Sequence, residues 1–218
     1  MYKLSPLSLS RRLATTAAVL ALSSAAWAVP EAQFEPAFQQ FVQASRGEEA
    51  AIEKSAAAFS ALMKADPGNP VLMAYAGAAT SMRANTTMLP WKKMGYSEDG
   101  LALLDKALAL LTPAHDAPLQ HGVPGALEVR FVAASTFLGV PGFMNRGARG
   151  TRLLGEVLSH SLFAASPLGF KGSVWLKAAN VAVQDKRPDE ARKYLNEVIL
   201  AKAPQAEAAR AQLAKLSS

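Results

Sequence analysis

The chain has 218 residues, of which half are hydrophobic, 18% are charged and none is cysteine. The lack of cysteine excludes a disulfide framework and a lipid-anchoring cysteine, and the hydrophobic content argues against intrinsic disorder. The formal charge is +6, but residues 1–28 hold three of the 23 basic residues and none of the 17 acidic ones, which leaves 20 − 17 = +3 for the rest. Because so small a charge argues against a nucleic-acid-binding surface, we expect no nucleic-acid partner.

The first 28 residues have the pattern of a secretory signal peptide. Lys3, Arg11 and Arg12 precede an apolar run over residues 13–22, and small residues suited to cleavage end at Ala28. The apolar stretch up to that point is 16 residues long, shorter than the ~20 that a membrane-spanning helix needs. We predict export to the periplasm and no stable membrane span after cleavage, with a retained anchor as the less favoured alternative. The arginine pair matches a twin-arginine signal only in part, so ordinary export is the default.

The first two predicted helices form a hairpin. Phe34, Phe38 and Phe41 recur on one face of an opening helix, which Gly47 would end. A second helix starts near Glu49, where a carboxylate is favoured by the positive end of the helix dipole. The apolar stripe of this second helix comprises Ile52, Ala56, Phe59 and Met63.

A four-residue turn, residues 66–69, leads into the third predicted helix. Asn69 can cap the first N–H groups, and Pro70 has no N–H to leave unpaired, so a helix should start there and run to about Ala84. Gly77 stands among alanines in the middle of this helix, where a glycine costs roughly 1 kcal/mol relative to alanine if exposed. We therefore expect Gly77 to let the backbone of a neighbouring helix approach closely.

The remaining sequence predicts six further helices. The fourth begins after Ser97, a candidate N-cap, the fifth covers residues 126–138, and the sixth covers residues 151–165. The last full pair lies on either side of Pro188, which suits the first position of a helix. A terminal helix over residues 205–216 has one apolar face, as expected for a cap.

Residues 55–82 resemble the tetratricopeptide repeat (TPR). The positions that match this family's pattern are Phe59, Leu62, Pro67, Met73, Ala76, Gly77 and Thr80. Trp175 and Ala191 stand at the family's interval in the last pair. The resemblance implies an all-α fold for residues 29–218, in which helical hairpins stack as a short TPR-like α-solenoid that residues 205–216 cap. A plain antiparallel helical bundle is the alternative, because periodicity alone does not distinguish stacking from bundling.

Two segments, residues 85–96 and 139–150, interrupt the predicted hairpins and carry the candidate binding residues. In a stacked array such turns project from one edge, so the two segments could meet. The candidates combine exposed apolar groups with cationic donors, and they are Trp91, Lys92, Lys93, Tyr96, Phe143, Asn145, Arg146, Arg149 and Arg152. Met94 and Met144 would add to the apolar floor. Large apolar groups on exposed loops either pack together or meet a partner, and both interpretations stay open for Trp91 and Phe143.

By resemblance, the protein is expected to be a non-catalytic scaffold or adaptor. It would hold a peptide or protein partner in an envelope complex for transport, secretion or cell-wall assembly. The alternative is a binding protein or small enzyme for an anionic small molecule at the Arg146–Arg152 loop. Gly147, Gly150 and Thr151 lead there into a helix N-terminus, whose free N–H groups attract anions, and the nearby arginines would reinforce this. These arginines could instead be solvated turn residues.

The sequence contains no recognisable catalytic or metal-binding motif. His115 and His121 lie in a Pro-rich connector, where histidines are usually polar surface, and Glu156 with His160 would not complete a zinc site. No Gly-x-Ser-x-Gly elbow, His-Glu-x-x-His motif or P-loop occurs. We therefore expect no enzymatic activity, no cofactor and no metal.

Export with cleavage after Ala28 predicts that the mature protein begins at Val29. The intact mass of the protein recovered from the periplasmic fraction checks this prediction. A mass that includes residues 1–28 would contradict it.

Overall fold

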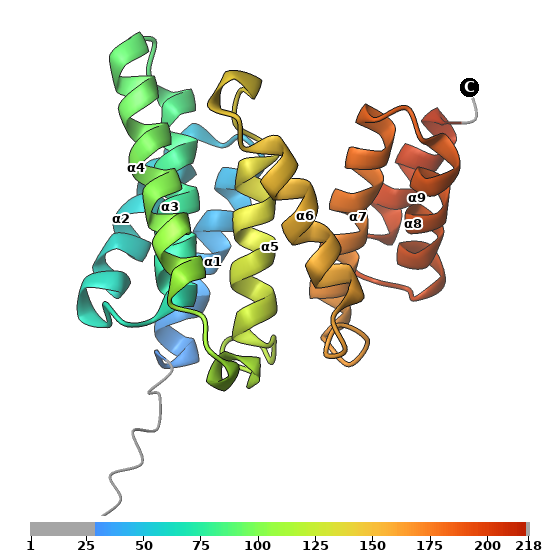
Figure 1. Cartoon of the computed structure of the whole chain (residues 1–218), viewed down its shortest axis with the longest axis horizontal. Helices are drawn as coiled ribbons and strands as arrows, with labels where there is room; N and C mark the ends of the chain where they lie inside the picture. The colour runs from blue at the N-terminus through green and yellow to red at the C-terminus, as the bar shows by residue number, and fades with distance from the viewer. Residues whose placement is uncertain (1–28, 217–218) are drawn as a thin grey trace, which may run out of the picture.

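The computed structural model describes residues 29–216, and within that range the protein is all-α, as predicted (Figure 1). The α-helices are α1 (Glu31–Ser45), α2 (Glu49–Ala65), α3 (Pro70–Met82), α4 (Pro90–Ala109), α5 (Gly125–Phe137), α6 (Gly147–Ser159), α7 (Leu168–Gln184), α8 (Pro188–Leu200) and α9 (Ala206–Lys215). Short 3-10 helices occupy three connections: η1 (Arg83–Thr86), η2 (Pro113–Asp116) and η3 (Gly142–Met144). The predicted signal peptide, residues 1–28, lies outside the described residues.

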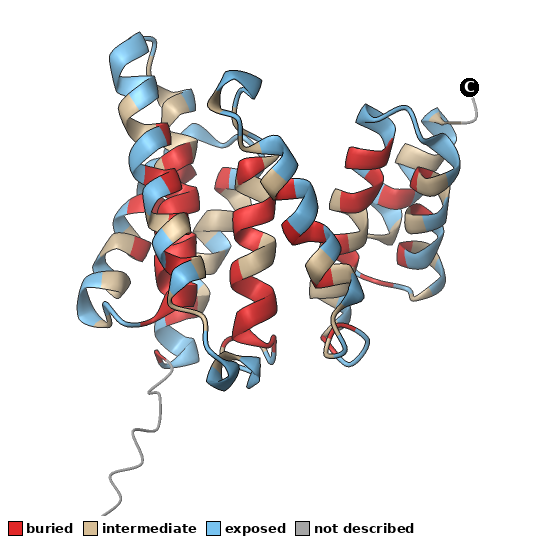
Figure 2. Ribbon diagram, in the orientation of Figure 1, coloured by how far each residue is buried: buried red, intermediate tan, exposed pale blue. Residues whose placement is uncertain are grey.

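Helix α3 is at the centre of the larger core. It packs against α1, α2, α4 and α5, and all but two of its 13 residues are buried (Figure 2). Asn69 caps it as predicted: its side-chain oxygen accepts hydrogen bonds from the backbone N–H groups of Val71 and Leu72, at 3.0 and 3.3 Å. An aromatic cluster surrounds Tyr75 on this helix and ties α1 and α2 to it. The rings that contact Tyr75 are Phe34, Phe38, Phe41 and Phe59.

Helices α7 to α9 enclose a second, smaller core beside α6 (Figure 1). Its buried members are Ala179, Leu195, Val198, Ala203 and Ala209. Helix α7 also contributes Val174 and Val181 to the larger core, so its two faces belong to different cores. This arrangement makes α7 the element that joins the two parts.

The close approach predicted at Gly77 is confirmed. A Cβ atom placed on Gly77 would lie 2.7 Å from the backbone oxygen of Gly100 in α4, and one on Gly100 would lie 2.5 Å from the oxygen of Gly77. Two glycines therefore face each other where α3 and α4 cross, and any larger side chain would force the helices apart. This contact determines where α4 runs across α3.

The predicted bounds of two helices are wrong. Helix α4 begins at Pro90 rather than after Ser97, because Pro90 occupies the first helical position and Ser97 lies buried inside the helix. Helix α6 runs from Gly147 to Ser159, and His160 leaves the helix in an extended conformation. Gly150, which the sequence placed in an interrupting segment, belongs to α6, where a Cβ would lie 2.8 Å from the side chain of Leu138.

As a result, the segments that interrupt the helix pairs are shorter than predicted. Residues 83–89 separate α3 from α4, and residues 138–146 separate α5 from α6. Among the described residues, no helix has the length and apolar character required to cross a membrane.

Replacing Gly77 with alanine should destabilise the fold by roughly 1–3 kcal/mol, because the added Cβ overpacks the α3–α4 crossing. The matched control is Gly155→Ala in α6, where a Cβ meets nothing within 4 Å. That change should be neutral or should stabilise the protein by up to about 1 kcal/mol, through the better helix propensity of alanine. Urea unfolding followed by circular dichroism measures both changes. Equal effects at the two positions would contradict the close-approach explanation.

Candidate functional site

The two predicted binding segments meet at one groove. The start of α4 and the η3 segment lie at the same end of the molecule (Figure 1). Between them is a groove of about 400 Å³, which brings Met94 of α4 together with Phe143 and Met144 of η3. The other lining residues are Glu98, Leu101, Ala102, Asp105 and Arg146. We call this the α4–η3 groove.

Apolar side chains are unusually exposed around the α4–η3 groove. Trp91 is 68% exposed and Phe143 is 67% exposed. Met88, Leu89 and Met94 are also exposed, so the first turns of α4 and the segment before it present several large apolar groups to solvent. Phe143 comes from a segment about fifty residues further along the chain, yet it lines the same groove as Met94. Exposed apolar side chains that cluster in this way mark interaction surfaces, whereas apolar residues scattered singly over a surface do not.

The arginines beside the groove are held by a carboxylate. Arg146 and Arg149 both contact Asp105 of α4, with nitrogen–oxygen distances of 3.1 and 2.5 Å. Both guanidinium groups also lie over the ring of Phe137, 5.4 and 5.2 Å from its centroid. Since two cations share one anion, the cluster retains a net charge of +1. Arg152 points elsewhere and pairs with Glu156, one turn further along α6.

The other predicted site residues divide into two groups. Lys92 and Lys93 are exposed next to Trp91, and no carboxylate in residues 29–216 lies within ion-pair distance of either. Tyr96 lies outside the groove, where its ring stacks under the guanidinium of Arg83 at 4.2 Å. Asn145 is exposed and ends η3 in the left-handed conformation, with φ of 54°. Of the predicted site residues, Phe143 and Arg146 line the α4–η3 groove. Trp91 and the two lysines lie in the first turn of α4, outside the groove lining, and Tyr96 and Arg152 are occupied by other contacts.

A buried acid that sequence reasoning missed lies in the larger core. Glu128 of α5 is only 3% exposed, and its Oε1 accepts a hydrogen bond of 2.8 Å from the hydroxyl of Tyr75. Its Oε2 has no hydrogen-bond partner among the described residues. Burial, with a smaller contribution from the nearby charge of Glu31, raises the pKa of Glu128 to about 8, against the lowering effect of the Tyr75 hydrogen bond. Burial likewise raises the pKa of Tyr75 well above its usual value.

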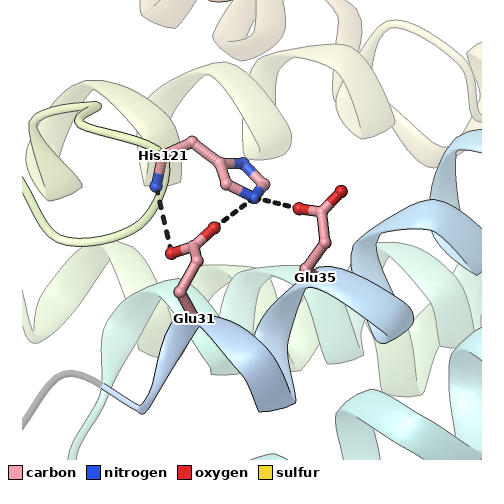
Figure 3. Close-up of side chains that lie close together, drawn as sticks. All are labelled: Glu31, Glu35 and His121. Atoms are coloured by element: carbon pink, nitrogen blue, oxygen red, sulfur yellow. Dashed lines mark hydrogen bonds and ion pairs between the residues drawn. The ribbon is translucent and has the colours of Figure 1, made fainter.

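A second missed cluster joins α1 to the loop before α5 (Figure 3). The Nε2 atom of His121 lies 2.6 Å from a carboxylate oxygen of Glu31 and 2.6 Å from one of Glu35. The His121 ring is packed edge-on against Phe34 and Phe38. The i, i+4 spacing of the glutamates was visible in the sequence. The histidine is 86 residues away from Glu35 and could be placed beside it only by the fold.

Comparisons with models of protein families, with curated proteins and with solved structures find no match to this chain. The function therefore has to be inferred from the geometry of its own residues. The α4–η3 groove brings together residues of both predicted binding segments: Met94 from the first, and Phe143, Met144 and Arg146 from the second.

The buried acid predicts a pH-dependent stability. Because the pKa of Glu128 is about 8 in the folded protein against a usual 4.5, the folded state binds its proton more tightly. Its contribution to stability is complete below pH 4.5 and is lost as the pH rises to about 8. Glu128→Gln keeps a neutral acceptor for Tyr75 and should be more stable than the wild type above pH 8. The free energy of unfolding of the variant, relative to that of the wild type, should rise by on the order of 4 kcal/mol between pH 4.5 and a pH above 8.

Urea unfolding of both proteins between pH 4.5 and pH 9 measures this difference. The difference between the two profiles isolates Glu128 from the other titrating groups. Parallel profiles across this range would show that Glu128 does not keep its proton in the folded protein.

Proposed function

We propose that this protein is an exported, non-catalytic adaptor that binds a peptide or protein partner at the α4–η3 groove. The observation that carries the proposal is the convergence of exposed apolar side chains from two distant segments on one groove. Phe143, which lines the groove, is the main anchor, and Trp91 in the first turn of α4 is a second one outside the lining, because aromatic groups are enriched among the residues that carry the binding energy of protein interfaces. The periplasm is the proposed compartment, on the basis of the signal-peptide pattern of residues 1–28.

A short TPR-like α-solenoid is the arrangement that we propose for residues 29–216. Each helix packs against the next, and the first helices of successive pairs also contact each other, since α3 touches both α1 and α5. This pattern of helix–helix contacts supports stacked hairpins more than a bundle, because all helices of a bundle share one core. Helix α9 packs mainly on α8 and supports the predicted role of a capping helix.

The charges around the groove indicate the chemistry of the partner. Lys92 and Lys93 are exposed beside Trp91, whereas within the groove the carboxylate of Glu98 offsets the net charge of +1 of the Arg146–Arg149–Asp105 cluster, so the two lysines carry the positive charge of this edge. A segment with an apolar anchor flanked by acidic residues would complement this edge. We therefore propose that the partner presents such a segment, as a component of an envelope complex for transport, secretion or cell-wall assembly.

The alternative function, binding or conversion of an anionic small molecule, has less support from the geometry. An anion at Arg146 and Arg149 would have to compete with the carboxylate of Asp105, which already contacts both. Arg152 is likewise paired with Glu156. The lining of the groove is largely apolar, which suits a partner's side chain better than a small charged ligand.

Site-specific photo-crosslinking in cells tests the proposed partner site. A benzophenone side chain in place of Phe143 should give a discrete covalent adduct with one partner protein. The control position is Leu200, which is also apolar and is 79% exposed, but lies at the end of α8, outside the groove lining. Lys92→Gln combined with Lys93→Gln should reduce the Phe143 adduct several-fold, because the edge loses two positive charges.

Adducts of equal yield at positions 143 and 200, or none at position 143, would reject the groove as the partner site. If the adduct is absent and inorganic phosphate raises the melting temperature of the purified protein, the anion-binding alternative is favoured instead.

A further inference from the structure

The cluster of Glu31, Glu35 and His121 lies far from the α4–η3 groove. The start of α1 and the loop before α5 are at the opposite end of the molecule from η3 (Figure 1). The three side chains offer one nitrogen and two carboxylate oxygens, all within 4.8 Å of one another (Figure 3). Both oxygens lie 2.6 Å from the same ring atom, Nε2 of His121.

A single proton does not satisfy this arrangement. Nε2 of an imidazole carries at most one hydrogen, directed along one line, so it can donate a good hydrogen bond to only one of the two carboxylates. The charges do not balance either, because two carboxylates bring −2 and a protonated histidine brings only +1. A divalent cation beside a neutral imidazole would contact all three ligand atoms and would make the total charge zero.

The remaining atoms of the cluster are already engaged in ways that aim the ligand atoms at one point. Gln39 donates a 2.6 Å hydrogen bond to Oε1 of Glu35, which leaves Oε2 facing His121. The backbone N–H of His121 approaches Oε2 of Glu31 at 3.4 Å, which leaves Oε1 for the ring nitrogen. Each carboxylate thus uses one oxygen for a protein donor and turns the other toward Nε2. Hydrogen bonds of this kind orient the ligands in metal sites.

The loop that carries His121 is held in place by backbone and side-chain contacts. His121 adopts a left-handed conformation with φ of 51°, and the following Gly122 has φ of 69°. Gln120 is buried, and its side-chain amide donates a 3.0 Å hydrogen bond to the backbone oxygen of Val29. An isolated bridge between Pro118 and Pro124 closes the loop. His121 is therefore fixed against α1 by its own loop as well as by its ring.

From this geometry we infer that Glu31, Glu35 and His121 form a site for a divalent transition-metal ion, with Zn²⁺ as the preferred ion. An imidazole nitrogen favours zinc over magnesium or calcium, which select oxygen ligands alone. Zinc bonds of about 2.0–2.2 Å require the ligand atoms to separate to about 3.3 Å, and the half-exposed glutamates can open by that amount. The fourth position would face solvent. The ion would cross-link α1 to the loop before α5.

Zinc titration of the tag-free protein after removal of bound metal with a chelator tests the inference. Isothermal titration should show one Zn²⁺ per chain, and Zn²⁺ should raise the melting temperature, whereas Mg²⁺ at the same concentration should not. Glu35→Gln should weaken zinc binding at least about tenfold, because it replaces a carboxylate ligand by an uncharged amide. His121→Asn should have the same effect, and asparagine tolerates the left-handed backbone at that position.

The matched control is Glu53→Gln. Glu53 is another half-exposed helical glutamate, but it pairs with Arg83 of η1, away from the cluster. This change should leave the zinc affinity as it is in the wild type. The inference is overturned if the wild type shows no saturable zinc binding, if Mg²⁺ stabilises it as much as Zn²⁺ does, or if Glu35→Gln and Glu53→Gln bind zinc equally well. Circular dichroism confirms that each variant is folded. None of these outcomes depends on the partner proposed for the groove.

Discussion

The close contact between α3 and α4 determines where the proposed binding edge lies. Gly77 and Gly100 let the two backbones approach until each Cα faces the other helix's carbonyl oxygen. Since α3 is almost fully buried, this contact fixes α4 relative to the larger core. The first turns of α4 then extend past the end of α3, where Trp91 and Met94 have no core to cover them. A contact between two residues without side chains thus positions side chains several turns away.

The molecule has polar chemistry at two separate ends. At the α4–η3 groove, Asp105 neutralises part of the arginine charge, so apolar anchors supply most of what a partner would contact. At the other end, Glu31 and Glu35 bring more negative charge than His121 can balance. Glu128 adds another carboxyl group, whose pKa is raised chiefly by its burial and to a smaller extent by the charge of Glu31. The two ends therefore differ in the kind of group that they attract.

Local patterns in the sequence predicted most of the fold, whereas the pairing of distant groups could not be predicted. The Asn69–Pro70 start signal, the Gly77 contact and the all-α class depend on neighbouring residues and are confirmed. The start of α4 was missed because proline occurs in turns as well as at the first helical position, and Pro90 occupies the latter. The sequence pattern allowed the two segments that carry Met94 and Phe143 to meet, and these residues do line one groove. The ion pairs of Arg146 with Asp105 and of His121 with Glu35 join residues about 40 to 90 positions apart. Hydrophobic periodicity contains no information about such pairs.

Helix α7 has one face in each of the two cores, and this has a consequence for how the protein opens. If α8 and α9 detach, the face of α7 that carries Ala179 becomes exposed, but Val174 and Val181 can stay packed on the larger core. The C-terminal pair can therefore fray as a unit at a lower free energy than global unfolding. Amide hydrogens in α8 and α9 would then exchange with solvent faster than those in α3, and α7 would separate the fast-exchanging part of the protein from the slow-exchanging part.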